Sequence, residues 1–141
     1  MKLKISVGVD FGKLANEMPE IIEKSMQRYA RNAEQGSKEA IDKGVKPKLK
    51  ESTIARRKQR GTGGSKPLFE TGTLYRSIKG SSEGLTLMKY GWNHHTGNLR
   101  SHTPQRKFIT ISKKSIMPVF DKFKKDVRLA LRRKTPLVLE T

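Results

Sequence analysis

The sequence predicts an α+β fold, in which a small antiparallel sheet packs against two long helices and a long basic loop lies between the helices. Three observations carry this prediction. Apolar and polar residues alternate near the start of the chain, as in a half-buried strand. Two later stretches place apolar residues every three or four positions, as in helices that cover a core. Residues 46–66 instead hold eight basic residues, one acidic residue and no apolar periodicity.

The length of 141 residues is sufficient for one domain with one core. We expect residues 1–134 to form this domain, with the basic loop 45–66 inside it, and residues 135–141 to form a C-terminal tail. Alternation from Leu3 to Phe11 predicts the first strand. Residues 13–43 predict one long helix across the sheet, with acidic residues early and basic residues late. Pro19 fits its first turn or a kink, and Gly44 is the expected stop.

Residues 45–67 predict a mobile loop, because they show no core pattern. A short helix from Ile54 to Arg60, capped by Ser52 or Thr53, is expected inside it. Gly61 ends this helix, and the glycine-rich residues 61–65 are flexible by composition. We expect the loop to be poorly ordered in a free subunit and to become ordered on assembly.

The second half predicts a helical turn, a hairpin and a final helix. Thr71 or Thr73 can cap a turn in which Leu74 and Ile78, four residues apart, pin it to the sheet. Residues 78–80 and 85–92 are the expected hairpin strands, with a turn at 81–84, a polar loop over 93–105 and a short strand through 108–111. The final helix begins at Ser115, has an apolar face and stops at Pro136. That face is Ile116, Phe120, Phe123, Val127, Ala130 and Leu131, and the apolar tail 137–139 is expected to dock.

The charge of the chain predicts an acidic partner. Lys and Arg number 31 against 13 Asp and Glu, a net charge of +18 that favours nucleic acid or acidic protein surfaces. The candidate docking or DNA-channel residues are Lys46, Lys48, Lys50, Arg56, Arg57, Lys58, Arg60 and Lys66. Residues 45–67 contain no aromatic side chain for base stacking, so contact with phosphates or with an acidic protein is expected to be non-specific.

Several classes of site are excluded by the residue pattern. The chain has no cysteine, which excludes disulfides and thiolate zinc sites. Ser65 precedes Lys66 and Pro67 follows it, so this glycine cluster is not a phosphate loop. The histidines at 94, 95 and 102 have no carboxylate in residues 85–119 to complete a metal site. We therefore predict a non-enzymatic protein without cofactor or metal. No apolar run approaches the roughly 20 residues of a membrane span, and synthesis in the cytoplasm is expected.

Two motifs, in order, carry a family resemblance. A Ser-Thr-Ile segment followed by basic residues contains Thr53 and Ile54. After the glycine-rich gap, the pattern Pro-Leu-x-x-Thr-Gly-x-Leu-x-x-Ser-Ile is matched at Pro67, Leu68, Thr71, Gly72, Leu74, Ser77 and Ile78. Downstream come His95 and Gly97, with Thr96 where the family has glutamine, and then Pro104, Arg106 and Phe108. Over about residues 45–134, this set resembles the tail-completion, or virion morphogenesis, proteins of tailed bacteriophages.

The resemblance implies a structural virion protein of the neck or tail, with an α+β domain. Six copies, or twelve, would form a ring that joins the head connector or adaptor to the tail tube or tail terminator protein. The basic loop would dock on a neighbouring ring or line the channel for genomic DNA. The alternative is a free basic protein that binds nucleic acid non-specifically through its charge.

Overall fold

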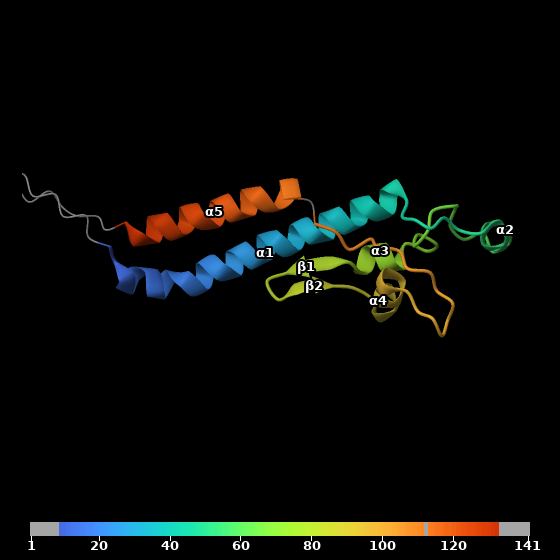
Figure 1. Cartoon of the computed structure of the whole chain (residues 1–141), viewed down its shortest axis with the longest axis horizontal. Coiled ribbons are helices and arrows are strands. Elements are labelled where there is room, and N and C mark those ends of the chain that lie inside the picture. Colours follow the sequence, from blue (N-terminus) through green and yellow to red (C-terminus); the bar gives the residue numbers. More distant parts are fainter. Residues whose placement is uncertain (1–8, 112, 133–141) are drawn as a thin grey trace, which may run out of the picture.

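The computed structural model describes residues 9–111 and 113–132. It is elongated, with the two longest helices side by side at one end and the smaller elements gathered at the other (Figure 1). This arrangement confirms the predicted α+β class, with a small antiparallel sheet packed against helices. The elements are α1 (Phe11–Lys43), α2 (Glu51–Gln59), α3 (Thr73–Ser77), β1 (Lys79–Ser81), β2 (Gly84–Thr86), α4 (Lys89–Thr96) and α5 (Lys113–Leu131).

The long first helix is confirmed, and it begins where the sequence predicted the end of a strand. Asp10 caps α1, because its Oδ1 accepts a hydrogen bond from the backbone N–H of Lys13 at 2.9 Å. Phe11 is therefore helical, and the prediction of strand at this residue is wrong. Val9 forms an isolated antiparallel bridge with Arg132, while the rest of the predicted strand lies outside the described residues. Gly44 follows the last helical residue, as predicted.

Helices α1 and α5 lie antiparallel, so the end of α5 meets the start of α1 (Figure 1). An ion pair joins Arg28 Nη1 to Asp126 Oδ2 at 3.3 Å. Further along, Asn32 Nδ2 donates to the carbonyl oxygen of Ser115 at 2.9 Å. Helix α5 begins at Lys113, so Ser115, which the sequence predicted as the start and N-cap of this helix, lies inside it. The predicted stop at Pro136 and the predicted tail lie outside the described residues.

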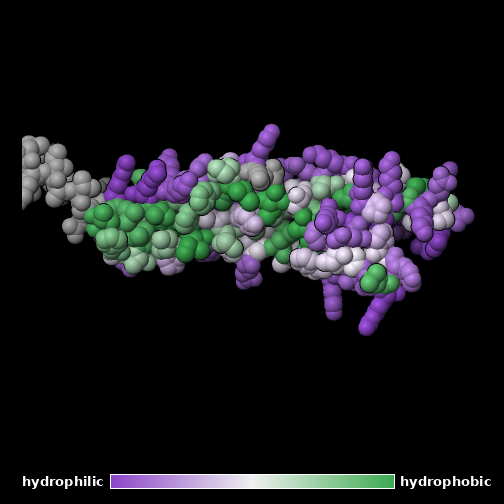
Figure 2. Space-filling view, in the orientation of Figure 1, coloured by the Kyte–Doolittle hydropathy of each residue, from purple (hydrophilic) through white to green (hydrophobic). Residues whose placement is uncertain are grey.

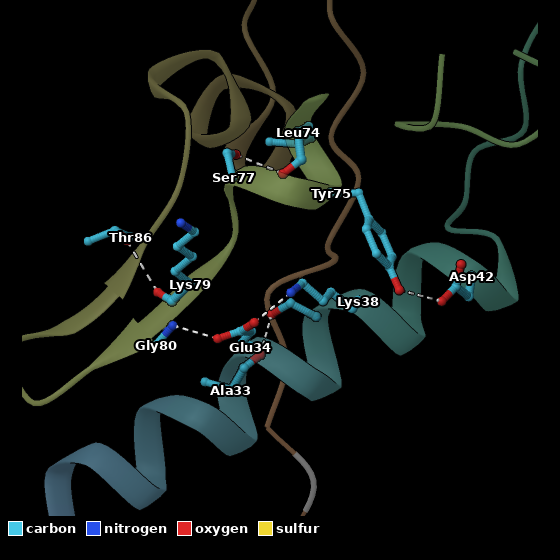
Figure 3. A network of polar contacts seen from close by, with 11 residues as sticks. Ala33, Glu34, Lys38, Asp42, Leu74, Tyr75, Ser77, Lys79, Gly80 and Thr86 are labelled. Atoms are coloured by element: carbon cyan, nitrogen blue, oxygen red, sulfur yellow. Dashed lines mark hydrogen bonds and ion pairs between the residues drawn. The ribbon is translucent and has the colours of Figure 1, made fainter. Parts of the chain in front are cut away.

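The sheet packs on the middle of α1 through a close backbone approach. A Cβ at Gly80 would lie 2.3 Å from the carbonyl oxygen of Ala30, so only glycine fits here. The Gly80 N–H donates to the Glu34 carboxylate at 2.8 Å, beside Lys38 (Figure 3). Hydrogen bonds from Lys38 and then from Gly80 lower the pKa of Glu34. The hairpin turn lies at the predicted residues, with Ser81 paired to Gly84.

The second predicted strand is much shorter than expected. β2 ends at Thr86, and α4 occupies residues 89–96, which were predicted as strand and polar loop. Gly91, in the first turn of α4, is buried against Leu74 of α3 and against Leu87, which precedes the helix. A Cβ at Gly91 would lie 2.5 Å from Leu87 Cδ1. This close packing of α4 on α3 overrides the short apolar alternation from which a strand was predicted.

Residues 108–111 do not form the predicted strand. They run as extended chain across α1, where the carbonyl of Thr110 lies against Gly36. Among the described residues the sheet consists of β1 and β2, and residues 108–111 join neither strand. Phe108 is nevertheless fully buried and completes a core with Ile41, Val45, Leu74 and Ile78. This core lies at the end of the molecule where α1 stops.

Candidate functional site

A cavity of about 260 Å³ lies at the end of the molecule that carries the motif residues. We call it the arginine pocket, because Arg57 and Arg106 both line it. Five motif residues take part, from the central motif and from the downstream segment. The lining residues are Leu49, Arg57, Leu68, Glu70, Thr71, Gly72, Thr73, Leu74, Tyr90, His94 and Arg106. The fold thus brings together residues that are distant in sequence.

Arg57 is buried, which contradicts its predicted place on an exposed docking loop. Only 8% of the residue is exposed. Its Nη1 donates to the carbonyl oxygens of Lys66 at 2.9 Å and Gly64 at 3.3 Å. Its Nε lies 3.5 Å from Glu70 Oε2, in an ion pair without a hydrogen bond. A buried guanidinium requires such partners, so Arg57 ties the glycine-rich segment to the domain.

The remaining basic residues of segment 45–66 are exposed. These are Lys46, Lys48, Lys50, Arg56, Lys58, Arg60 and Lys66. The helix in this segment is α2, which begins three residues before the predicted start and has Lys50 as its N-cap. Ser52 and Thr53 therefore lie inside α2 and do not cap it. Val45 is buried in the core, so the segment contains core residues that its composition did not reveal.

Arg106 is the second buried cation of the pocket, with 7% of the residue exposed. Its Nε donates to the carbonyl oxygen of Pro47 at 3.0 Å, and its backbone N–H donates to the carbonyl oxygen of His94 at 2.7 Å. Among the described residues, no carboxylate forms an ion pair with Arg106. Burial, and then the positive charge of Arg57, lower its pKa. The pocket therefore holds two repelling guanidinium groups.

The central motif shapes one wall of the pocket. Gly72 is the N-cap of α3 with φ 72°, so the predicted capping by Thr71 or Thr73 is wrong. The two threonine hydroxyls instead lie 2.8 Å from each other. Leu74 and Ile78 are buried as predicted, and their core partners include Ile41 of α1 as well as Phe108. Together with a Tyr75–Asp42 hydrogen bond of 3.0 Å, they attach α3 to α1 (Figure 3).

The two adjacent histidines of α4 have different surroundings. His95 Nδ1 accepts from the Ile109 N–H at 3.3 Å, and its ring meets Phe108 edge-on. His94 Nδ1 is buried without a hydrogen-bond partner among the described residues. Burial, followed by Arg106, lowers the pKa of His94, whereas burial and then Lys107 lower that of His95. No group of three potential metal ligands occurs in the part of the chain that the structure describes.

A second feature lies at the opposite end, on α1 and α5. An apolar groove of about 420 Å³ runs between them (Figure 2). We call it the α1/α5 apolar face, formed by Ile22, Ser25, Met26, Tyr29, Ile116, Val119, Phe120 and Phe123. Ile22 and Phe120 are about half exposed, at 49% and 50%. The sequence correctly indicated these apolar stripes, but it assigned them to the core of the subunit.

The wrong assignment has a simple cause. The predicted sheet was expected to cover both helices, whereas the observed sheet has two strands of three residues each. The apolar stripes of the two long helices are longer than a small sheet can cover. This mismatch is the signal that could have indicated an exposed apolar surface. Single exposed apolar residues are ordinary, but a continuous apolar groove indicates an interaction site.

No family model, no curated protein and no solved structure matches this chain. Within residues 9–111 and 113–132, none of the helices combines the length and apolar character needed to cross a membrane.

Proposed function

We propose that this chain is a structural virion protein of the phage tail-completion type. Several copies form a ring at the neck, which joins the head connector to the tail. The α1/α5 apolar face is the observation that supports this proposal most directly. We take a second copy of the chain as its occupant, and burial of its half-exposed aromatic and aliphatic side chains would stabilise that contact by about 25 cal/mol per Å² of apolar area.

The charges beside the apolar face support a second copy as the occupant. Glu20 and Glu23 are exposed on the first half of α1, where Glu20 forms an ion pair with Lys24. Lys125 and Arg128 are exposed on α5, with no ion pair to another described residue. Exposed Glu23 on α1 of one subunit and the exposed cations on α5 of the next are therefore complementary. In the proposed ring, α1 of each subunit packs on α5 of the next, so that each contact joins two different surfaces and the ring closes on rotation.

The basic residues of α2 lie at the far end of the molecule from this face (Figure 1). A ring built through α1 and α5 leaves that end free. There it can dock on a connector or adaptor, on a tail tube or terminator protein, or beside the genomic DNA. The resemblance leads us to expect six subunits, or twelve, in the ring.

The second candidate is a basic protein that binds nucleic acid non-specifically. It is favoured by a shallow basic groove on α5, lined by Lys124, Lys125, Arg128, Leu129 and Arg132 with Asp121. Counterion release would drive such binding, which would weaken steeply with salt. The two candidates differ in what the apolar face does.

Light scattering after gel filtration tests the proposal. Wild-type protein should elute as a closed oligomer, and Phe120→Glu should reduce it to monomers. Leu99→Glu is the control, because Leu99 is 96% exposed and far from the face in the fold. Mass spectrometry of purified virions should find the chain in particles. A monomeric wild type that binds DNA with a steep salt dependence, and is missing from particles, would establish the second candidate instead.

A further inference from the structure

We propose that the arginine pocket binds a carboxylate group carried by an acidic segment of a partner protein. This site is distinct from the α1/α5 apolar face. The inference goes beyond the ring proposal and holds for an isolated subunit.

The pocket has more positive charge than its own residues neutralise. Arg57 and Arg106 both line it, and Glu70 is its acidic residue. Glu70 is already engaged, because it accepts a hydrogen bond from Thr62 at 3.0 Å and also faces Arg60 at 4.0 Å. Arg106 has no carboxylate partner among the described residues. An anion in the cavity would offset the repulsion between the two guanidinium groups.

The cations are held in place before any ligand arrives. Arg57 is fixed by two backbone carbonyls, and Arg106 Nε is fixed by the carbonyl of Pro47. Neither side chain therefore needs to give up much freedom on binding. A planar guanidinium offers paired N–H groups that match the two oxygens of a carboxylate. The remaining N–H groups of Arg106 are the ones we assign to the ligand.

His94 also lines the pocket, and burial, followed by the charge of Arg106, lowers its pKa. Its Nδ1, which has no hydrogen-bond partner in the described residues, is shut off from solvent and therefore does not face the open cavity. The imidazole is thus part of the pocket wall, and the ligand is assigned to the two arginines.

The lining favours a protein side chain over nucleic acid. Leu49, Leu68 and Leu74 give the cavity an apolar part beside its cations. An Asp or Glu side chain has an apolar stem and a carboxylate head, which suits a mixed cavity of about 260 Å³. A phosphodiester is flanked by a sugar on both sides and has no apolar stem to place against these leucines. The exposed lysines of segment 45–66 are better placed for a nucleic-acid backbone.

Fluorescence anisotropy with short labelled peptides tests the proposal on the full chain at fixed ionic strength. One amidated peptide carries an internal Glu among apolar residues, and its twin carries Gln at that position. A third peptide has no acidic side chain but a free C-terminal carboxylate. The Glu peptide should bind at least about tenfold more tightly than the Gln peptide. Arg106→Gln should remove this preference. Arg56→Gln, which removes an exposed charge from α2, should keep it.

A cavity-filling variant and the peptide with a free carboxylate provide two further tests. Leu49→Trp narrows the cavity without changing a charge, so it should also remove the preference, and thermal melting shows whether each variant folds. The free carboxylate peptide distinguishes a chain terminus from a side chain as the source of the ligand. Equal binding of the Glu and Gln peptides, an unchanged preference in folded Leu49→Trp, or displacement by inorganic phosphate but not by acetate would overturn the inference. Light scattering on the same samples reports the oligomer separately, so a failed ring and a failed pocket are distinguishable.

Discussion

The two ends of this molecule use apolar residues in opposite ways. At the end where α1 stops, Ile41, Leu74, Ile78 and Phe108 are covered by α3 and the extended chain. At the other end, Ile22 and Phe120 of α1 and α5 are half exposed. One end thus has a core that is closed within the chain, whereas the other has an apolar surface that the described residues leave open. The same residue types therefore stabilise the subunit at one end and, under our proposal, the assembly at the other.

The largest difference in stability should be seen between two phenylalanine substitutions, one at each end of the molecule. Phe108→Ala removes a fully buried ring and should lower the free energy of unfolding by about 3–5 kcal/mol. Phe120→Ala should change that of a dissociated subunit by less than about 1 kcal/mol, because its ring is already half in water. Its effect should appear as a weaker oligomer. Urea unfolding and light scattering measure the two quantities, and equal losses of subunit stability would remove the distinction between the ends.

The next largest difference in stability should be seen between alanine substitutions at two glycines. Gly80→Ala places a methyl group 2.3 Å from the Ala30 carbonyl oxygen, so the hairpin must move away from α1, at a cost of about 1–3 kcal/mol. Gly64→Ala is the control, because no atom lies within 4 Å of its added Cβ. Thermal melting compares them. A stable Gly80→Ala protein would show that the hairpin does not need this close approach.

Arg57→Gln should cost a similar or smaller amount, about 1–3 kcal/mol, because it leaves the Lys66 and Gly64 carbonyls and Glu70 without their partner. Its exposed neighbour Arg56→Gln should change the free energy of unfolding by about 0.5 kcal/mol or less. Trypsin should cleave segment 45–66 faster in the first variant than in the second. Identical cleavage would mean that Arg57 does not hold the glycine-rich segment.

The smallest effect concerns Glu34 and pH. Its pKa is lowered in the folded chain from an ordinary value of 4.5, by Lys38 and by the Gly80 N–H. The folded state therefore favours the ionised form. The resulting stability is present above the unfolded pKa and is lost as pH falls through the lowered folded pKa. Wild type should lose more stability than Glu34→Gln in this acidic range, with Glu23→Gln as the exposed control. Parallel pH profiles for wild type and Glu34→Gln would contradict the role of Glu34.

Sequence reasoning was most successful where one periodicity extends over a long stretch. It predicted both long helices and the hairpin turn, because stripes and turn residues are local signals. It failed at Trp92, where a short alternation is overridden by packing of Gly91 on Leu74. It also failed at Arg57, which it placed on an exposed loop, and it gave no indication that Arg106 is buried, because both burials depend on carbonyl groups brought in by other segments. Composition places arginine at a surface, and only the fold shows which ones are enclosed.

Helix α1 is long enough for a small tilt at one point to displace its end by several ångströms. Its 33 residues span about 50 Å at a rise of 1.5 Å each. On α1 the apolar face extends from Ile22 to Tyr29, close to the middle of this rod, and the chain turns towards α2 beyond Lys43 (Figure 1). The 17 residue steps from Met26 to Lys43 span about 25 Å, so a tilt of about 10° at the apolar face would swing the end of α1 by roughly 4 Å. In the ring proposed above, small adjustments between neighbouring rods would thus set the width of the opening that their far ends enclose.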